Sequence, residues 1–275
     1  MSPPSAGGGL ELIELEQPRA VAERVAALVL TERLRHPGRP LGLATGRTME
    51  PVFSALARDL ALLPAAQRQA VRRDWLSFNL DEYVGLAAVD PHSFAASMAR
   101  QVVAPLGLDP ARVLLPDGRA ADPDAEAHLY AGALAAAGGI GLQLLGLGLN
   151  GHVGFNEPPC GPEAACRCVP LSATTRHQNA AGFGGDPTAV PERAITLGLA
   201  EILAAERIVL VVTGAAKADV LRRCLEEPPT PELPASWLQS HPAFTVITDG
   251  AALGRGRLRP PSPSPAEHPR PPDSW

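Results

Sequence analysis

The stretch "LGLGLNGHVGFNEPP", residues 145–159, brings together side chains that can move protons. His152 carries an imidazole that titrates near neutral pH, so it can both accept and donate a proton. The nearby carboxylate of Glu157 can orient the ring and change its pKa. Together with Asn150, these side chains indicate acid–base chemistry that requires no metal ion.

A nucleotide cofactor is the alternative interpretation, because residues 146–151 match the pattern G-x-G-x-x-G. A dinucleotide-binding loop also requires a helix that begins at the third glycine and an acidic residue about 20 positions later. Here Gly154, Pro158 and Pro159 disfavour such a helix, and residues 164–185 contain no Asp or Glu. We therefore reject the dinucleotide interpretation and expect no cofactor.

Two adjacent carboxylates, Asp81 and Glu82, follow a second apolar run, "WLSFNL" (residues 75–80). Neighbouring side chains of an extended chain point in opposite directions. One carboxylate can therefore act as a base while the other anchors the structure. A pair of solvated loop acids is the alternative, because isolated carboxylates are mostly exposed.

A third group of residues could bind a phosphate anion. Small and hydroxyl-bearing residues follow a short apolar run and lead into a helical pattern; they are Thr45, Gly46, Arg47 and Thr48. Backbone N–H groups and the positive end of a helix favour anions at such a turn. Lys217, at the start of another predicted helix, can add a point charge. Ordinary helix capping and a surface lysine are the alternatives.

These residues all follow predicted strands of an alternating α/β pattern. The predicted strands are residues 10–15, 41–44, 75–80, 141–147, 207–213 and 243–249, and helices are expected over 18–35 and 92–103. Short apolar strands separated by helices indicate a mostly parallel sheet that is covered on both faces. Ligands bind at the carboxyl ends of such strands, so the polar residues there define the expected site.

The composition excludes several classes of function. A formal net charge of -5 and an aromatic content of 4% argue against nucleic-acid binding. The N-terminus lacks the basic and apolar regions of a signal peptide. Residues 129–151 are uncharged and long enough to span a bilayer, but Gly138 and Gly139 divide them into a predicted helix and a short strand. We expect a cytoplasmic protein with no membrane partner.

The two ends of the chain and its cysteines are expected to take no part in catalysis. Residues 1–9 and the proline-rich residues 254–275 are predicted to be disordered, which leaves one domain over residues 10–253. Three cysteines are spaced C-x5-C-x-C, which does not fit the usual zinc patterns; they are Cys160, Cys166 and Cys168. We expect reduced thiols and no metal, with a labile metal or redox role as the alternative.

Seven segments together resemble the glucosamine-6-phosphate deaminase family. They are "LGLATGRTMEPVF", "SFNLDEYVGL" with "DPHSF", "LGLGLNGHVGFNEP", "TTRHQNA", "VPERAITLGLAEIL", "VLVVTGAAKADVL" and "WLQSHPAFTVITD", between about residues 40 and 250. The related 6-phosphogluconolactonases share the glycine turn and its histidine, but they typically continue with serine, leucine, phenylalanine and proline. This chain has "GFNEP" there, which favours the deaminase branch.

The resemblance implies a modified Rossmann-like α/β fold without a cofactor, in which the substrate is an amino-sugar phosphate. The family converts glucosamine 6-phosphate and water to fructose 6-phosphate and ammonia. Carried over by motif, His152 handles the proton of the ring oxygen while Asn150 and Glu157 support it. Asp81 takes the C2 proton of the open-chain sugar and returns it at C1.

The resemblance also implies that the sugar phosphate lies on residues 45–48 and Lys217, and that the glycines of residues 146–151 leave room for the sugar. The sequence departs from the family pattern at two positions of the expected phosphate site. Relatives usually have a second glycine where this chain has Arg47, and an arginine that binds the phosphate where it has Ala181. Our hypothesis is that Arg47 replaces the lost charge, because arginine suits phosphate geometry.

Three alternatives remain open at this stage: a deaminase of galactosamine 6-phosphate, a lactonase-like hydrolase, and a sugar-phosphate-binding regulator without turnover. Family members range from monomers to hexamers, so a homo-oligomer is one expectation. Some are activated by N-acetylglucosamine 6-phosphate. We expect no such activation, because the cysteine-rich residues 159–170 stand where effector contacts lie in some relatives.

Overall fold

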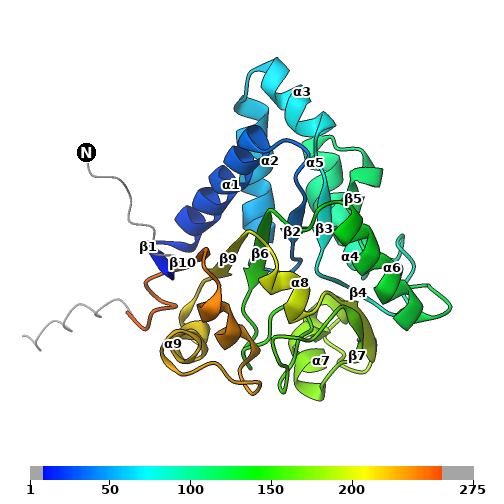
Figure 1. Ribbon diagram of the computed structural model, residues 1–275, viewed down its shortest axis with the longest axis vertical. Coiled ribbons are helices and arrows are strands. Elements are labelled where there is room, and N and C mark those ends of the chain that lie inside the picture. Colours follow the sequence, from blue (N-terminus) through cyan, green and yellow to red (C-terminus); the bar gives the residue numbers. More distant parts are fainter. Residues whose placement is uncertain (1–8, 256–275) are drawn as a thin grey trace, which may run out of the picture.

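The computed structural model describes residues 9–255 of the chain. The predicted disordered ends lie outside this range, except for Gly9, Gly254 and Arg255. Figure 1 shows an α/β arrangement in which helices flank a central sheet. The predicted fold class is therefore confirmed.

The central sheet has seven parallel strands in the order β1-β10-β9-β6-β2-β3-β5. They are β1 (Glu11–Leu15), β2 (Leu41–Leu43), β3 (Ser77–Asn79), β5 (Val113–Leu114), β6 (Leu142–Gly146), β9 (Arg207–Val212) and β10 (Phe244–Asp249). All but the two-residue β5 were predicted, with slightly wider boundaries. Residues 208–212 of β9 are all buried, as expected for a strand covered on both faces.

The strand order creates a crevice between β2 and β6. From β2 the chain proceeds to β3 and β5 on one side, whereas from β6 it proceeds to β9 and β10 on the other. The loops that leave the carboxyl ends of β2 and β6 therefore diverge. This is the topological switch point at which open α/β sheets bind ligands.

The helices pack their apolar sides against this sheet and against each other. They are α1 (Pro18–Arg35), α2 (Glu50–Leu62), α3 (Ala65–Arg73), α4 (Phe94–Met98), α5 (Ala104–Leu106), α6 (Pro123–Ala136), α7 (Ala173–Asn179), α8 (Leu199–Leu203) and α9 (Ala218–Glu226). In α1, Pro18 begins the helix, and Val21, Val25 and Val29 are buried at four-residue spacing. Helices α1 and α2 lie side by side (Figure 1).

A second, antiparallel sheet was not predicted. Its strands are β4 (Asp81–Tyr83), β7 (Arg167–Pro170) and β8 (Arg193–Thr196), in the order β4-β8-β7. These short strands are not the continuous apolar runs that revealed β2 and β3, since they contain charged residues such as Asp81, Glu82, Arg167 and Arg193, so the sequence did not reveal them. Leu80 joins the two sheets, because its N–H donates to Leu43 of β2 while its carbonyl accepts from Leu197 after β8. Asp81 therefore begins a strand rather than a loop.

The helix predicted over residues 92–103 begins two residues later, at Phe94. Ser93 is its N-cap, since the Ser93 hydroxyl oxygen accepts a hydrogen bond from the Ala96 N–H. A π-helical turn, Ala99–Val103, separates α4 from α5. Such turns are often found at functional sites, and this one adjoins the pocket described below.

The uncharged segment 129–151 divides as predicted. Its first part is the end of α6, a turn at Gly138 and Gly139 follows, and β6 completes it. Within residues 9–255, no helix is both long and apolar enough to cross a membrane. The four cysteines carry free thiols, and three of them are buried; these are Cys160, Cys166 and Cys224.

Gly198 lies where no larger residue fits. A Cβ atom there would lie 1.9 Å from the carbonyl oxygen of Ala164 and 2.5 Å from the carbonyl carbon of Ala165, both of them backbone atoms. We expect Gly198→Ala to lower the free energy of unfolding by about 2 kcal/mol or more, because the backbone must shift. Urea unfolding monitored by circular dichroism measures this change.

The matched control is Gly132, an exposed residue within α6 that has nothing within 4 Å of an added Cβ. Gly132→Ala is expected to stabilise the protein by about 0.5–1 kcal/mol, because alanine favours the helix. Equal effects of the two substitutions would contradict the proposed crowding at Gly198.

Candidate active site

A cavity of about 450 Å³ lies at the carboxyl ends of the central strands. Seven of the nine predicted site residues line it: Thr45, Gly46, Arg47, Thr48, Asp81, His152 and Lys217. They come from the loops after β2, β6 and β9 and from the first residue of β4, so sequence segments far apart converge at the switch point. The other two, Asn150 and Glu157, lie outside the lining.

Asn150 determines how the ring of His152 presents its nitrogens. The Asn150 side-chain oxygen lies 2.6 Å from Nδ1 of His152 and also accepts the backbone N–H of His152 at 3.3 Å. An amide oxygen can only accept, so Nδ1 carries the ring proton. Nε2 is then the unprotonated nitrogen, with a lone pair available for a ligand in the cavity.

Burial keeps the His152 ring neutral. It lowers the pKa of His152 to about 4; the Glu157 carboxylate opposes this change, and the Lys217 ammonium adds to it. A neutral imidazole at physiological pH can accept a proton and then return it. The charge of Glu157 acts without a hydrogen bond, since the carboxylate instead accepts from Ser172 N–H and Ser172 Oγ, each at 2.8 Å, and from the Thr175 hydroxyl.

Glu157 therefore anchors α7 rather than touching the histidine. Ser172 is the N-cap of α7 and Thr175 lies in its first turn, so the carboxylate fixes the start of that helix. The 3-10 turn that follows α7, Ala180–Phe183, contributes to the wall of the cavity. Glu157 links the histidine loop to this wall.

Asp81 is enclosed more tightly than any other acid in the lining. Asp81 is 6% exposed. Its burial raises the pKa of its carboxyl group to about 8, and the negative charge of Glu82 makes a smaller contribution in the same direction. A carboxylate with such a raised pKa is a stronger base than one in water. An added Cβ at Gly154 would lie 3.5 Å from Asp81 Oδ2, so this glycine packs beside the carboxyl group.

The glycines of residues 146–151 have different surroundings. A Cβ at Gly148 would lie 2.4 Å from ring atoms of His152, so the imidazole packs directly on this backbone. Gly151 has a φ of 82° and lies against Leu233. Gly146 has no neighbour within 4 Å of an added Cβ, and both Gly146 and Gly148 line the cavity. The prediction that these glycines leave room for a sugar stays a prediction.

Positive charge gathers at one end of the cavity. Lys217 is half-buried, and its Nζ donates to the Leu147 carbonyl oxygen at 2.6 Å, which ties the loop after β9 to the loop after β6. Burial, followed by the charge of Arg47, lowers the pKa of Lys217. The two cations therefore influence each other, and an anion bound between them would relieve their repulsion.

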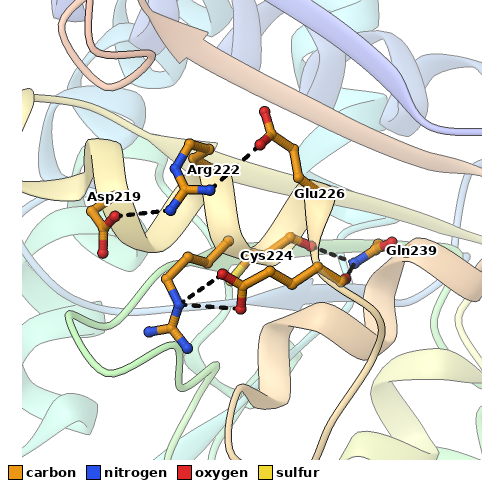
Figure 2. A network of polar contacts seen from close by, with 7 residues as sticks. Asp219, Arg222, Cys224, Glu226 and Gln239 are labelled. Atoms are coloured by element: carbon orange, nitrogen blue, oxygen red, sulfur yellow. Dashed lines mark hydrogen bonds and ion pairs between the residues drawn. The ribbon is translucent and has the colours of Figure 1, made fainter.

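The carboxyl end of α9, the helix that Lys217 directly precedes, is capped by a side chain. Figure 2 shows the Gln239 side-chain amide donating to the carbonyl oxygens of Cys224 and Glu227, each at 2.8 Å. These bonds satisfy carbonyls at the helix end. Arg222 pairs with Asp219 and Glu226 on the exposed side, where such pairs contribute little.

The sequence did not reveal an aromatic cluster in the lining of the cavity. Of the six phenylalanines and two tyrosines in the chain, four pack together here: Tyr83, Phe94, Phe155 and Phe183. His92 stacks on Phe183 with ring centroids 4.9 Å apart. Pocket residue Arg100 was also missed. The scarcity of aromatic residues was a usable signal, because half of the phenylalanines and tyrosines meet at one place.

The cavity thus places a buried carboxyl, a neutral histidine and the cations of Arg47 and Lys217 around one space, a combination typical of enzymes that move protons on phosphorylated substrates. Residues 16–247 match the family model described as glucosamine-6-phosphate isomerases/6-phosphogluconolactonase, so the chain belongs to this family.

Individual relatives agree with that assignment. A glucosamine-6-phosphate deaminase from Rhodopirellula baltica is 40% identical over 248 residues, which cover 89% of this chain and 96% of the relative. A solved structure of a monomeric glucosamine-6-phosphate deaminase is 31% identical, with a TM-score of 0.82 over 90% of this chain and 100% of the other. The 6-phosphogluconolactonase of Trypanosoma cruzi shares the fold at 18% identity, with a TM-score of 0.68 over 90% of this chain and 97% of the other.

The raised pKa of Asp81 predicts a pH-dependent stability. The folded protein favours the protonated carboxyl, so this contribution to stability is fully present below the unfolded pKa of about 3.9 and is lost as the pH rises towards 8. As the pH rises from 5 to 8, we expect the free energy of unfolding of Asp81→Asn to increase relative to that of the parent by about 4 kcal/mol. Urea unfolding at several pH values measures this difference.

Asp219→Asn, on the exposed side of α9, is the matched control, because the Asp219 side chain is 78% exposed. Its free energy of unfolding, plotted against pH, should run parallel to that of the parent. Parallel curves for Asp81→Asn would show that burial does not disfavour the ionised form of Asp81.

Proposed function

We propose that the protein is a glucosamine-6-phosphate deaminase, which converts glucosamine 6-phosphate and water to fructose 6-phosphate and ammonia. The observation that carries this proposal is the pairing of a buried carboxyl, Asp81, with a neutral histidine, His152, in one cavity beside a cationic turn. Relatives about 40% identical over most of the chain bear this name.

Ring opening is assigned to His152. Its neutral Nε2 takes the proton of the C1 hydroxyl, and the ring then returns a proton to the ring oxygen as the C1–O5 bond breaks. The hydrogen bond to Asn150 keeps the other nitrogen, Nδ1, protonated throughout. The product of this step is the open-chain amino aldehyde.

Isomerisation is assigned to Asp81. Its carboxylate removes the C2 proton of the open-chain sugar; the electron pair forms the C1–C2 double bond, and the aldehyde oxygen takes up a proton, which gives an enolamine. Asp81 then returns its proton to C1 and leaves an imine at C2. Water adds to the imine carbon and ammonia departs, which gives the ketone. Every step transfers a proton or a water molecule, so one carboxylate and one histidine suffice.

The phosphate is assigned to the cationic end of the cavity. Thr45, Gly46 and Thr48 offer hydroxyls and backbone N–H groups ahead of α2, while Lys217 and Arg47 supply charge. Arg47 also replaces the positive charge expected at Ala181, which lines the same cavity without one. The sugar is thereby oriented with its reacting carbons towards Asp81 and His152.

We propose that a single chain is the catalytic unit, because residues of this chain supply the carboxyl, the imidazole and the cations of the cavity and a similar deaminase of solved structure is monomeric. We also propose that it acts in the cytoplasm, where phosphorylated sugars occur and where its four free thiols would stay reduced.

Incubation with glucosamine 6-phosphate, followed by measurement of ammonia and fructose 6-phosphate, tests the proposal. We expect both products in equal amounts and a loss of kcat of at least about 100-fold in Asp81→Asn, because the base is removed. Galactosamine 6-phosphate, tested in parallel, identifies the preferred epimer. Hydrolysis of 6-phosphogluconolactone without ammonia release would favour a lactonase, and binding without turnover would favour a regulator.

Removal of the Arg47 charge tests the phosphate assignment. We expect Arg47→Ala to raise KM for the sugar phosphate about 10-fold with little change in kcat, because a uniform binding contact is lost. Arg24→Ala, on the exposed side of α1, is the matched control and should leave KM unchanged. An unchanged KM in Arg47→Ala would remove this arginine from the phosphate site.

A further inference from the structure

Glu82 is a buried carboxylate that does not line the cavity, although it follows Asp81 directly. It is 2% exposed and lies in the middle of β4. Because side chains of a strand alternate, Asp81 and Tyr83 face the cavity while Glu82 points to the other side. The proposed chemistry gives this group no role, so its burial requires another explanation.

Three backbone N–H groups donate to the Glu82 carboxylate. Oε1 accepts from Tyr83 at 2.8 Å and from Phe94 at 3.0 Å, and Oε2 accepts from Ala95 at 2.8 Å. Phe94 and Ala95 are the first two residues of α4. The carboxylate therefore fastens the start of α4 to the strand that carries Asp81.

The segment held in this way forms one wall of the cavity. Six of its residues line the cavity: Pro91, His92, Ser93, Phe94, Ser97 and Arg100. Residues 94–106 continue as helical turns, so the position of their start determines where Ser97 and Arg100 lie. Displacement of this start would move the whole wall relative to Asp81.

The same carboxylate also acts on Asp81 through its charge. The ionisable groups near Asp81 are Glu82 and Tyr83 on its own strand, Tyr130 of α6 and His152 across the cavity, while Asp90 faces Glu82. Of these, Glu82 supplies the negative charge that raises the pKa of Asp81 beyond the effect of burial.

We propose that Glu82 is a positioning residue for the deaminase reaction: it holds the wall formed by residues 91–100 against β4 and places a second negative charge beside the catalytic Asp81. The proposal rests on the proposed function and extends it to a residue that does not reach the substrate. It also explains the adjacent carboxylates, one facing the cavity and the other facing the protein.

Two substitutions separate the two effects. Glu82→Gln removes the charge, and it also loses at least one of the three hydrogen bonds, because an amide nitrogen cannot accept an N–H. Glu82→Asp keeps the charge but shortens the side chain by one methylene. Its carboxylate is then too far from α4 to accept both N–H groups of Phe94 and Ala95 with good geometry. Glu226→Gln, at an exposed surface pair, is the control.

The experiment records the pH dependence of kcat/KM and the titration of the Asp81 carboxyl carbon, measured by NMR with ¹³C-labelled aspartate and assigned with Asp81→Asn. In Glu82→Gln we expect the Asp81 midpoint and the acid limb of kcat/KM to move to lower pH by at least about half a unit. In Glu82→Asp we expect KM to rise several-fold. The control should match the parent in all three measurements.

An Asp81 midpoint and acid limb that are unchanged in Glu82→Gln would overturn the electrostatic role, and an unchanged KM in Glu82→Asp would overturn the positioning role. If Glu82→Gln does not fold, the Asp81 titration of the parent protein still tests the electrostatic role. Its Asp81 titration curve should show a second inflection as Glu82 ionises, and a simple one-step curve would overturn the electrostatic role.

The NMR titrations need no turnover, so they are independent of the proposed function. A parent protein that releases no ammonia but shows the shifted Asp81 titration would contradict the deaminase proposal alone. A parent protein that releases ammonia but shows no effect of Glu82 substitution would contradict the positioning proposal alone.

Discussion

The whole site depends on the enclosure of one carboxyl group, Asp81, at the junction between the two sheets. Leu80 bonds to β2 on one side and to the residue after β8 on the other, so the chain has no freedom at this point. Burial there disfavours the ionised form and makes Asp81 a stronger base. The fold therefore encloses a carboxyl group whose pKa is strongly raised, a common feature of active sites.

Burial acts in the opposite sense on His152. The same low-polarity surroundings that favour a protonated carboxyl favour an unprotonated imidazole, so burial shifts the two pKa values in opposite directions and favours the uncharged form of both groups. The hydrogen bond from Nδ1 to Asn150 then directs the free nitrogen to the cavity. In the proposed steps, burial of Asp81 and His152 and the hydrogen bond from His152 to the Asn150 amide set up the proton transfer, and no metal ion takes part.

Much of this arrangement could be predicted from the sequence. The strand and helix pattern predicted the parallel sheet, and the rule that ligands bind at its carboxyl ends selected residues such as Asp81, His152 and Lys217, which do line one cavity. The prediction was less accurate where spacing alone carries little information. Glu157 was expected to orient His152 and to tune its pKa. Its charge does act on the pKa of His152, but its carboxylate bonds to Ser172 at the start of α7 and not to the ring.

The sequence by itself determined the element order and the residue types that can do chemistry, because hydrophobic periodicity and strand-end positions are local properties. Only the tertiary structure decided which side each residue faces and how strongly it titrates. In the small sheet, Asp81 of β4 pairs with Thr196 of β8, which lies far along the chain, so no local pattern could reveal that pairing. That pairing separates Asp81 from Glu82, facing one carboxylate to the cavity and the other to α4, and burial then gives the two acids different roles.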